Sequence, residues 1–536
     1  MQQVYIKRMT KQDITRSVAI CTESVEPFWD LSLRNTTDYT NISVCHVDQP
    51  NYFPSDITIH KGYGGEKDWR ICGNDWKKLY ADDNPQEGDM MIVRKIGYRR
   101  FSIQIAKRGS SEYVLLSTFF SGKDNYVLLS TDDALTQKPT EPETLNVITK
   151  ESPYRPFITA IKSKPFLLLA GISGTGKSRI VRELARACWD TNSEEYKAQK
   201  PRNFEMVQVK PNWHDSSELI GYVSRIDGVR YVVGPFLKFM VKATQDPETP
   251  YFLCLDEMNL APVEQYFAEY LSVIESRKRQ EDGTITTDPI IDYSNTDEYY
   301  SLISQLFPGD ENAKAEYLTE EGGKRLSIPQ NLIVVGTVNM DETTFSFSRK
   351  VLDRAMTIEM NEVNLRGGLV DRNEKIGKLG KNELVGTSVE GVDVYSTYKE
   401  VCRTTIKYLE SINEKLEGTP FKIAYRTRNE TLLYVINNLP YNKDKDGNAL
   451  DENYVIARAL DEITNMKILS RIEGDTTKID NLLEQLTSTI AEHLKEVSGE
   501  EFSSKRDEPN KYYSVSLAKL EEMKRRLDGG FTSFWS

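Results

Sequence analysis

The segment from Phe166 to Ser178 constrains the fold of this chain most strongly, because it joins an apolar run directly to a glycine-rich loop. The run Phe166-Leu-Leu-Leu-Ala170 leads into a complete G-x-x-x-x-G-K-S pattern. Glycines allow backbone conformations in which successive N–H groups point at one anion, and a helix starting at the loop directs its positive end to the same place. The pattern predicts a buried strand, a phosphate-binding loop and a helix. The predicted nucleotide-binding residues of the loop are Gly171, Ile172, Ser173, Gly174, Thr175, Gly176, Lys177 and Ser178.

A second apolar run, Tyr251–Leu255, ends in the acidic pair Asp256 and Glu257. The carboxyl ends of parallel strands meet at one edge of a sheet, so we expect this pair beside the phosphate loop. There the Lys177 ammonium would contact the β- and γ-phosphates, while the Ser178 hydroxyl and the Asp256 carboxylate would hold Mg²⁺. Glu257 would polarise the attacking water as a catalytic residue.

A third apolar run, Leu332–Gly336, delivers Thr337 and Asn339 to the same predicted edge. An amide there can hydrogen-bond the γ-phosphate or the attacking water, which makes Asn339 a candidate catalytic residue. The next segment carries three cations, Arg349, Lys350 and Arg354. A guanidinium offered from this segment to a neighbouring subunit would stabilise charge in the transition state. The alternative is that these cations form the solvated face of a helix.

The spacing of apolar residues divides the chain into three parts. Residues 1–150 carry short alternating runs and turn residues, which predict a small, mostly-β domain. Residues 151–365 predict an α/β core, a parallel sheet with flanking helices, with a polar insertion at about 280–327. Residues 366–536 show helical spacing and predict a lid domain. The predicted core strands are Phe166–Ala170, Phe204–Val209, Tyr251–Leu255, Leu332–Gly336 and Met356–Met360, and the predicted lid helices are Tyr398–Glu417, Arg428–Leu439, Asn453–Ser470, Ile479–Val497 and Ser516–Asp528.

Composition narrows the possible classes of function. A chain of 536 residues is too long for one hydrophobic core. It has no apolar run of eighteen residues, so no membrane-spanning helix is expected. Its six cysteines lack paired spacing, which favours a reducing cytoplasm over a disulfide framework or a zinc site. The net charge of -12 argues against general coating of nucleic acid.

One basic run stands out against this acidic background. Between Met91 and Ser110 the chain carries six cations and no acid. A local basic face indicates a nucleic-acid surface better than the total charge does. The predicted DNA-binding residues are Arg94, Lys95, Arg99, Arg100 and Lys107.

Together these motifs resemble the AAA+ superfamily. Their amino-acid sequences are similar to those of its McrB-type branch, the nucleotide-driven motor subunits of modification-dependent restriction systems. The resemblance covers about residues 150 to 536. Four segments carry it: Val209-Lys-Pro-Asn-Trp-His-Asp-Ser-Ser-Glu-Leu-Ile-Gly-Tyr222, Asp256-Glu-Met-Asn-Leu-Ala261, Gly336-Thr-Val-Asn-Met-Asp-Glu-Thr-Thr344 and Lys350-Val-Leu-Asp-Arg-Ala355.

The resemblance implies roles for individual residues. Asn339 would be the family's sensor-one residue, and Arg354 its arginine finger. Either Arg426 or Arg428 would be the lid's second sensor, with Arg428 taken here as the nucleotide contact. The sequence departs from the family's Met-Asn-Thr-Ala-Asp pattern after Val338, so the family's acidic signature residue is either Asp341 or Glu342.

The resemblance also implies cofactors and partners. The branch favours GTP, so GTP with Mg²⁺ is expected, and ATP is the alternative. A finger supplied by a neighbour implies a homo-oligomeric ring, expected to be a hexamer. DNA and a separate McrC-like nuclease subunit are the expected partners, because no nuclease motif is evident in this chain.

The N-terminal region is similar to the plant-type DNA-binding pseudobarrel. Its features are the tryptophans Trp69 and Trp76, then Gln86-Glu-Gly-Asp89, then two strands around the basic run. In that fold, basic side chains contact phosphates and polar loops read base edges. An alternative is an aromatic pocket for a flipped modified base, built from Trp29, Trp69 or Tyr98. A third interpretation is that these aromatic residues are simply the core of a β domain.

The sequence therefore favours an NTPase subunit of an McrBC-like restriction complex that binds DNA through its N-terminal domain. A MoxR-like ATPase that remodels a protein substrate would carry the same nucleotide motifs. A DNA-binding scaffold with an inactive nucleotide site is the non-enzymatic alternative, and the intact Lys177, Asp256, Glu257 and Asn339 argue against it.

Overall fold

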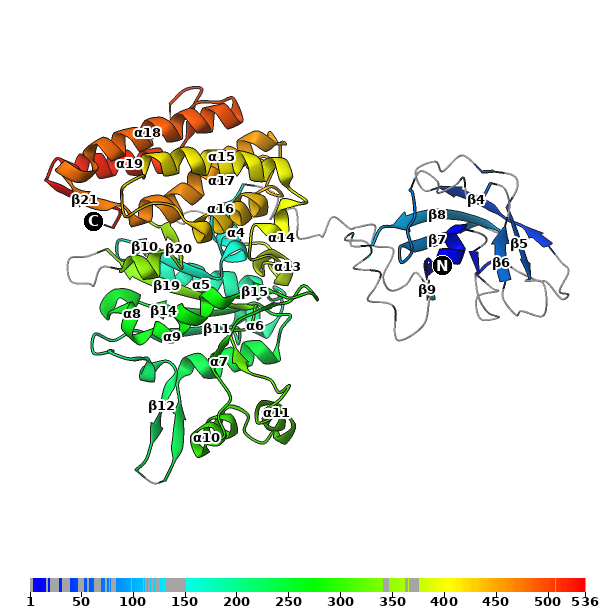
Figure 1. The fold of residues 1–536 in the computed structure, drawn as a ribbon, viewed down its shortest axis with the longest axis horizontal. Helices are drawn as coiled ribbons and strands as arrows, with labels where there is room; N and C mark the ends of the chain where they lie inside the picture. Colours follow the sequence, from blue (N-terminus) through cyan, green and yellow to red (C-terminus); the bar gives the residue numbers. More distant parts are fainter. Residues whose placement is uncertain are drawn as a thin grey trace. The chain divides into compact units, whose positions relative to one another are not determined.

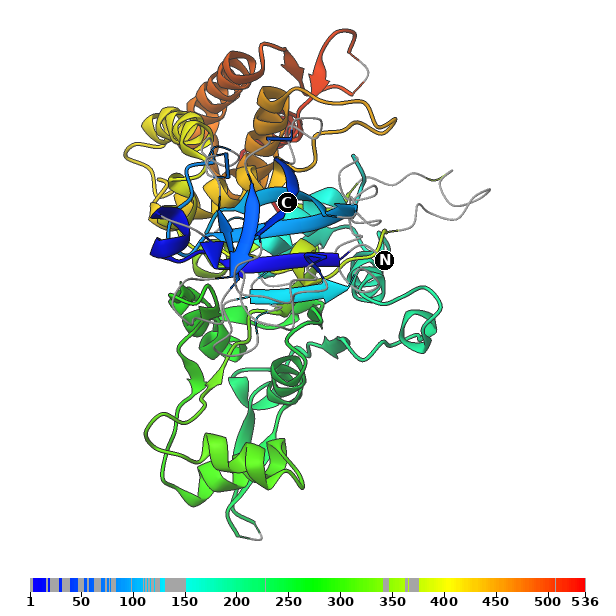
Figure 2. The same cartoon turned by 90° about the vertical axis from the view of Figure 1, so that its right-hand side faces the viewer.

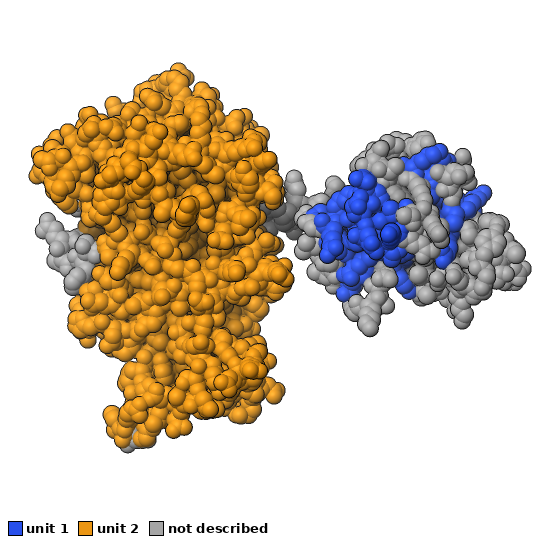
Figure 3. Space-filling model, in the orientation of Figure 1, with its two compact units in different colours: residues 1–141 blue, residues 142–536 orange. Residues whose placement is uncertain are grey.

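The computed structural model divides into two compact units, Met1–Glu141 and Pro142–Ser536 (Figure 3). The residues that the structure describes are 3–15, 18–19, 28–30, 39–46, 53–54, 57–61, 69–72, 75–76, 78, 83–97, 99–108, 110, 113, 116, 120, 126–130, 151–226, 228–340, 347–361, 365, 376–506 and 508–535.

The first unit is mostly β, as predicted. A five-stranded sheet has the order β4-β8-β7-β1-β9, and a four-stranded sheet has the order β2-β6-β5-β3. The basic run forms the hairpin of β7 and β8, whose strands pair antiparallel. Phe28, Trp29, Trp76 and Phe101 are buried in the core of this unit. Its elements are β1 Gln3–Arg8, α1 Lys11–Thr15, β2 Val18–Ala19, β3 Tyr39–Asn41, β4 Ser43–His46, β5 Thr58–Lys61, β6 Trp69–Cys72, β7 Met90–Gly97, β8 Arg100–Ala106 and β9 Tyr126–Ser130.

The second unit is built on a parallel five-stranded sheet with the order β11-β14-β19-β10-β20 (Figure 1). All five predicted strands are confirmed, as β10 Phe166–Gly171, β11 Phe204–Gln208, β14 Tyr251–Asp256, β19 Leu332–Asn339 and β20 Met356–Glu359. The strands β10, β14 and β19 are almost continuously apolar and buried because helices cover both faces of the sheet. The helices of this core are α4 Arg155–Ser163, α5 Lys177–Ala187, α6 Glu194–Lys197, α7 Pro235–Gln245, α8 Val263–Tyr266, α9 Ala268–Val273 and α12 Arg349–Leu352.

Additional elements project from the core on the side away from the lid (Figures 1 and 2). The hairpin of β12 and β13 lies beside α10, which follows within the polar insertion. Apolar side chains of α10, such as Leu302 and Ile303, join the same buried cluster as α7, so this region shares the core of the sheet. The projecting elements include β12 Gly221–Ser224, β13 Arg230–Val233, α10 Asp297–Leu306 and α11 Glu311–Tyr317. The remaining elements of this part of the chain are β15 Lys278–Arg279, β16 Ile285–Thr286, β17 Pro289–Ile291 and β18 Leu326–Ser327, with short 3-10 turns η3 Ser216–Glu218, η4 Met258–Leu260 and η5 Ile274–Ser276.

The C-terminal part is helical, as predicted, and forms a lid on the sheet (Figures 1 and 2). One buried apolar cluster contains side chains of β10, β19 and the lid helices, so the lid and the core share hydrophobic surface. The helix α17 continues into a π-helical turn, η6, and a 3-10 turn, η7. The lid elements are α13 Lys381–Leu384, α14 Val392–Tyr395, α15 Lys399–Lys415, α16 Tyr425–Asn438, α17 Glu452–Ile463, η6 Thr464–Ile468, η7 Leu469–Arg471, β21 Glu473–Asp475, α18 Thr476–Ser498, β22 Phe502–Ser503, β23 Tyr512–Tyr513, α19 Val515–Leu527 and β24 Phe531–Ser533.

Candidate active site

The phosphate loop joins β10 to α5 at the C-terminal edge of the sheet. Gly174 and Gly176 both have φ of 84°, a left-handed conformation that glycine adopts without steric cost. Gly171 packs so closely that an added Cβ would lie 2.6 Å from the carbonyl oxygen of Met360. Lys177 folds across the loop, and its ammonium donates to the carbonyl oxygens of Gly171 at 2.9 Å and Ile172 at 2.8 Å. The loop residues predicted from the sequence are therefore together in the predicted strand–loop–helix.

Helix α5 and the strands β14 and β19 bring oxygen ligands together beside this loop. The Ser178 hydroxyl donates to the Asp256 carboxylate at 2.5 Å, and the Thr337 hydroxyl donates to the same carboxylate oxygen at 2.8 Å. Hydroxyl and carboxylate oxygens suit Mg²⁺, which usually binds one or two protein oxygens and fills its other positions with water and phosphate. Among the described residues no group of three or more His, Cys, Asp or Glu could hold a metal ion.

Glu257 is held in an unusual backbone conformation by the neighbouring strand β19. Its φ of 54° is rare for a residue with a side chain, and such strain gathers at functional sites. Its N–H donates to the Thr337 hydroxyl at 2.9 Å, and its carboxylate accepts from the Asn339 amide at 3.0 Å. Asn259 in turn donates to the carbonyl oxygen of Asn339 at 3.1 Å. Glu257 and Asn339 are therefore in direct contact, beside Asp256.

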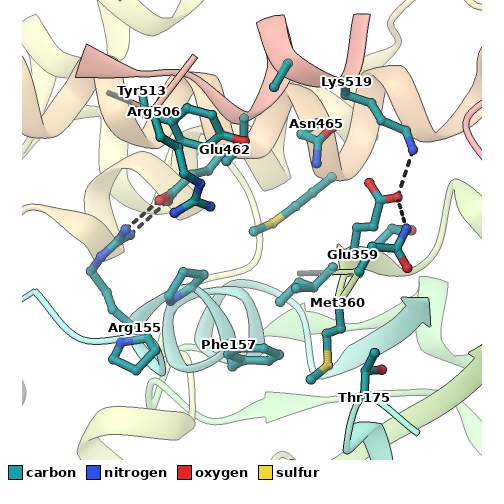
Figure 4. Close-up of a pocket in the computed structure, with 18 of the residues that line it drawn as sticks. Arg155, Phe157, Thr175, Glu359, Met360, Glu462, Asn465, Arg506, Tyr513 and Lys519 are labelled. Carbon is teal, nitrogen blue, oxygen red and sulfur yellow. Dashed lines mark hydrogen bonds and ion pairs between the residues drawn. The ribbon is translucent and has the colours of Figure 1, made fainter. Parts of the chain in front are cut away.

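The sequence did not indicate a second row of polar contacts that runs from the loop to the lid. The Ile172 N–H donates to the side-chain oxygen of Asn361 at 3.0 Å, and the Asn361 amide donates to Glu359 at 2.6 Å. The buried Lys519 of α19 donates to the same Glu359 carboxylate at 2.8 Å (Figure 4). Asn361 lies just beyond the end of β20, and Asn339 is the last residue of β19. A search of the sequence for polar residues at strand ends could therefore have identified Asn361 as a candidate. No sequence motif around Lys519 indicates that it contacts this row of residues.

A cavity of about 1200 Å³ adjoins the loop at Thr175 (Figure 4). It lies between α4, the end of β20 and the lid, and its apolar lining includes Phe157 and Met360. Asn465 points into it from the lid (Figure 4). Its volume exceeds the range of about 300–1,000 Å³ that is usual for small-molecule pockets, so it has room for a ligand that also reaches the loop.

The predicted finger, Arg354, lies at the opposite edge of the sheet. Its guanidinium donates to the carbonyl oxygens of Leu271 at 2.8 Å and Lys350 at 2.7 Å, and lies 3.8 Å from the Glu275 carboxylate. It precedes β20, which runs parallel to β10 in register with it. The six-residue length of β10 separates that edge from the phosphate loop by about 20 Å. Arg354 therefore cannot reach the phosphate loop of its own chain.

The two lid arginines contact other residues of their own chain. Arg426 pairs with Glu275, the carboxylate that also faces Arg354. Arg428 donates to the side chain of Asn429 at 2.8 Å and covers the ring of Tyr425. The start of α16 is thus at the Arg354 edge of the sheet. The assignment of Arg428 as the nucleotide contact stays a prediction.

The basic hairpin in the first unit is paired with acids that are distant in sequence. Lys95 pairs with Asp30 at 2.6 Å, and Lys107 pairs with Asp89 at 3.2 Å. Asp89 accepts further hydrogen bonds from the backbone, which outweigh burial and lower the pKa of its carboxyl. Arg94 donates to Gln104, while Arg100 is exposed and lies over the ring of Phe53. The basic face predicted from the sequence is therefore partly neutralised.

The aromatic residues of this unit have different environments. Trp29 is fully buried between Tyr5, Phe28 and Phe101, so it belongs to the core and not to an open base pocket. Trp76 is also buried. Several predictions lie outside what the structure describes: residue 98, the side chain at position 69, and positions 341 and 342, the two candidates for the acidic signature.

Comparison with known proteins gives matches in both halves of the second unit. Residues 166–296 match the family described as the AAA domain of the dynein-related subfamily. Residues 385–530 match a family described as a domain of unknown function. No helix among the described residues combines the length and apolarity needed to cross a membrane.

A curated relative is the EcoKMcrB subunit of a type IV methyl-directed restriction enzyme of Escherichia coli (strain K12). It is 24% identical over 205 residues, which are 38% of this chain. The match spans about a third of that relative, 36% of its length.

Two solved structures also show similarity. The N-terminal domain of Helicobacter pylori LlaJI.R1 is matched at 17% identity and a TM-score of 0.20, covering 24% of this chain and 99% of that one. A suspected ATPase of Cytophaga hutchinsonii is matched at 15% identity and a TM-score of 0.30, covering 61% of this chain and 84% of that one.

Proposed function

We propose, from the premise that this chain is a nucleotide-hydrolysing AAA+ protein of the McrB type, that it is the motor subunit of an McrBC-like restriction complex. The observation that carries the proposal is the contact between Asn339 and Glu257, beside a carboxylate that accepts from Ser178. A site that only bound nucleotide would not need a strained acid held by two residues of the next strand. This arrangement favours hydrolysis over an inactive scaffold.

The nucleotide would lie with its phosphates on the loop and its base and ribose in the adjoining cavity. Lys177 would bind the β- and γ-phosphates, and Ser178 and Asp256 would hold Mg²⁺. Glu257 would orient and deprotonate the attacking water, and Asn339 would fix the direction of its carboxylate. GTP is proposed as the substrate because the McrB branch favours it, and ATP remains the alternative.

The active form would be a ring, with six subunits as the expected number. Arg354 lies about 20 Å from the phosphate loop of its own chain, so its guanidinium is available only to a neighbour. A heterologous interface that repeats around an axis closes into a ring. Each site would then consist of one chain's loop and the next chain's arginine.

We further propose that the first unit binds DNA in the cytoplasm and that a separate McrC-like nuclease docks on the ring and cuts. Arg100 supports this proposal as an exposed cation on the hairpin of β7 and β8. Hydrolysis would drive movement or remodelling of the complex on DNA.

A MoxR-like role, remodelling a protein substrate, is the second candidate. It is favoured by the pairing of Lys95 with Asp30 and of Lys107 with Asp89, which reduces the positive charge available to DNA. Binding of labelled DNA to the Arg100→Glu variant separates the two roles: weakened binding supports restriction, and no DNA binding by either protein supports remodelling.

Replacing Glu257 with glutamine tests the assignment of the active site. The amide cannot accept the proton of the attacking water, so turnover should fall by roughly 10²- to 10⁴-fold while nucleotide binding persists. Phosphate release and nucleotide affinity would be measured with GTP and with ATP. Glu264→Gln is the matched control, because Glu264 is exposed on the nearby α8. Unchanged turnover in Glu257→Gln would refute the assigned role.

A further inference from the structure

Lys467 is a fully buried lysine that the proposed reaction does not use. It lies on η6 of the lid, with no exposed surface. Its ammonium donates to the carbonyl oxygens of Asp353 at 2.8 Å and Ala355 at 2.9 Å, and pairs with Glu430 at 2.7 Å. Arg354 stands between the two residues whose carbonyls accept. A lid residue therefore holds the backbone on both sides of the arginine that is offered to the neighbour.

A second lid cation holds the same segment. Arg471 of η7 donates to the Asp353 carboxylate at 2.8 Å and to the carbonyl oxygen of Phe421 at 3.0 Å. The segment follows the four-residue helix α12, whose last carbonyls have no partner within the helix. Lys467 donates hydrogen bonds to backbone carbonyl oxygens at the C-terminal end of α12. Without these two cations, α12 is too short to fix the direction of Arg354 by itself.

Glu430, the carboxylate that pairs with Lys467, connects this lysine to other charged residues at the Arg354 edge of the sheet. Glu430 pairs with both Lys467 and Lys164, and these cations outweigh burial and keep the pKa of the Glu430 carboxyl below its usual value. Lys164 precedes β10 and also lies 3.5 Å from Glu275, the carboxylate that faces Arg354. A buried ion pair of this kind contributes little net stability over apolar side chains, so a specific geometry is the better reason for its presence.

The turn that carries Lys467 also lines the cavity beside the phosphate loop. Asn465 and Met466, the two preceding residues, belong to the lining of that cavity, and Figure 4 shows Asn465 pointing into it. The side-chain oxygen of Asn465 is buried and has no hydrogen-bond partner. A π-helical turn is rare and is frequently found at functional sites. Here it places consecutive side chains on two surfaces, one toward the cavity and one toward Arg354.

We propose that Lys467 is a positioning residue for Arg354, and that η6 couples occupancy of the chain's own nucleotide cavity to the arginine it presents to the next subunit. This inference rests on the proposed ring NTPase. A ligand that contacts Asn465 would shift η6, and Lys467 would carry that shift to the backbone around Arg354. One short turn thus communicates between successive sites of the ring.

The proposal predicts that Lys467→Met has the same defect as a variant that lacks Arg354, and not the defect of a variant that cannot bind nucleotide. Misplacement of a catalytic group by about 1 Å costs roughly 100-fold in rate, so turnover should fall by about 10- to 100-fold. The affinity of the phosphate loop for nucleotide should change by less than about threefold, because Lys467 does not contact that loop. Lys478→Met is the matched control, since Lys478 is an exposed lid lysine with 75% of its side chain accessible.

Mixing subunits separates the two kinds of variant. Lys177→Ala chains lack a working loop but keep Arg354, and Arg354→Ala chains have the reverse defect. In a random equimolar mixture about a quarter of the sites combine a working loop with a working finger, so activity should return to about a quarter of wild type. Lys467→Met mixed with Lys177→Ala should recover in the same way, and Lys467→Met mixed with Arg354→Ala should not.

Further variants keep the test decisive if Lys467→Met does not fold. The double variant Glu430→Gln with Lys467→Met removes both buried charges together, and Asp353→Asn weakens the Arg471 anchor at a residue that is partly exposed. Each should regain activity when mixed with Lys177→Ala chains and should not regain it when mixed with Arg354→Ala chains. Failure of Lys467→Met or the double variant to recover with Lys177→Ala would overturn the positioning role, as would full activity of these variants by themselves. The proposed function itself would fail separately, if Lys177→Ala and Arg354→Ala did not complement each other.

Discussion

A single buried hydroxyl, that of Thr337, connects Asp256, the acid proposed to hold the metal, to Glu257, the acid proposed to activate water. It donates to the Asp256 carboxylate at 2.8 Å and accepts the N–H of Glu257 at 2.9 Å. Thr337→Val keeps the shape of the side chain and removes both hydrogen bonds. We therefore expect this variant to lose stability and activity together.

The magnitude follows from the two contacts. A hydrogen bond to a charged group contributes about 1.5–3 kcal/mol, and a buried donor left without a partner costs about 1–3 kcal/mol. Together these give about 3 kcal/mol of lost unfolding free energy, after allowance for water that reaches the site. Release of the strained Glu257 backbone should also slow turnover by about tenfold, which corresponds to about 1.4 kcal/mol.

Thr357 on β20 provides an internal control for this prediction. It is equally buried, but its hydroxyl has no hydrogen-bond partner. Thr357→Val removes an unsatisfied polar group and should leave stability unchanged or raise it by about 1 kcal/mol or more. Urea unfolding of the second unit and steady-state turnover would be measured for both variants. If Thr337→Val is no less stable than Thr357→Val, the reasoning about the shared hydroxyl is wrong.

Two further predictions concern charge. Burial raises the pKa of Asp461 to about 6, although Ser514, Val515 and Ser516 donate to it. Because this folded-state value exceeds the unfolded value, its stabilising contribution is complete below about pH 4 and is lost as the pH rises through about 6, a change of about 3 kcal/mol. Asp461→Asn should therefore gain unfolding free energy relative to wild type between pH 4.5 and 7.5, and a constant difference across that range would exclude the effect. Asp30→Asn removes the carboxylate that pairs with Lys95. If the hairpin contacts DNA, this variant should bind DNA several-fold more tightly, with a log–log salt slope steeper by about one, and Asp75→Asn should not.

The fold of the second unit could largely be predicted from the sequence, because its signals are local. The strands β10, β14 and β19 are apolar runs of six to eight residues, and β14 and β19 end in polar residues at the same edge. Gly174, Gly176 and Lys177 specify the loop by backbone freedom and spacing, independent of the rest of the chain. The same local patterns brought Asp256 and Asn339 to that edge.

Contacts across long sequence separations could not be predicted. The cations of the β7–β8 hairpin formed a basic run in the sequence, and only the fold pairs Lys95 with Asp30. Likewise, only the packing of the lid against the sheet places Lys519 beside Glu359. Side-chain partners of this kind depend on how the lid meets the sheet.

By itself, therefore, the sequence determined the nucleotide-binding elements: the strand, the glycine-rich loop and the acids at the strand ends. Their conformations depend on residues that are neighbours in the sequence and on continuous apolar runs, which are local features. The tertiary structure alone decided how each site depends on the lid and on a neighbouring subunit. Lys467 lies more than a hundred residues from Arg354, and the packing of η6 against β20 brings its ammonium to the carbonyl oxygens of Asp353 and Ala355 on either side of that arginine.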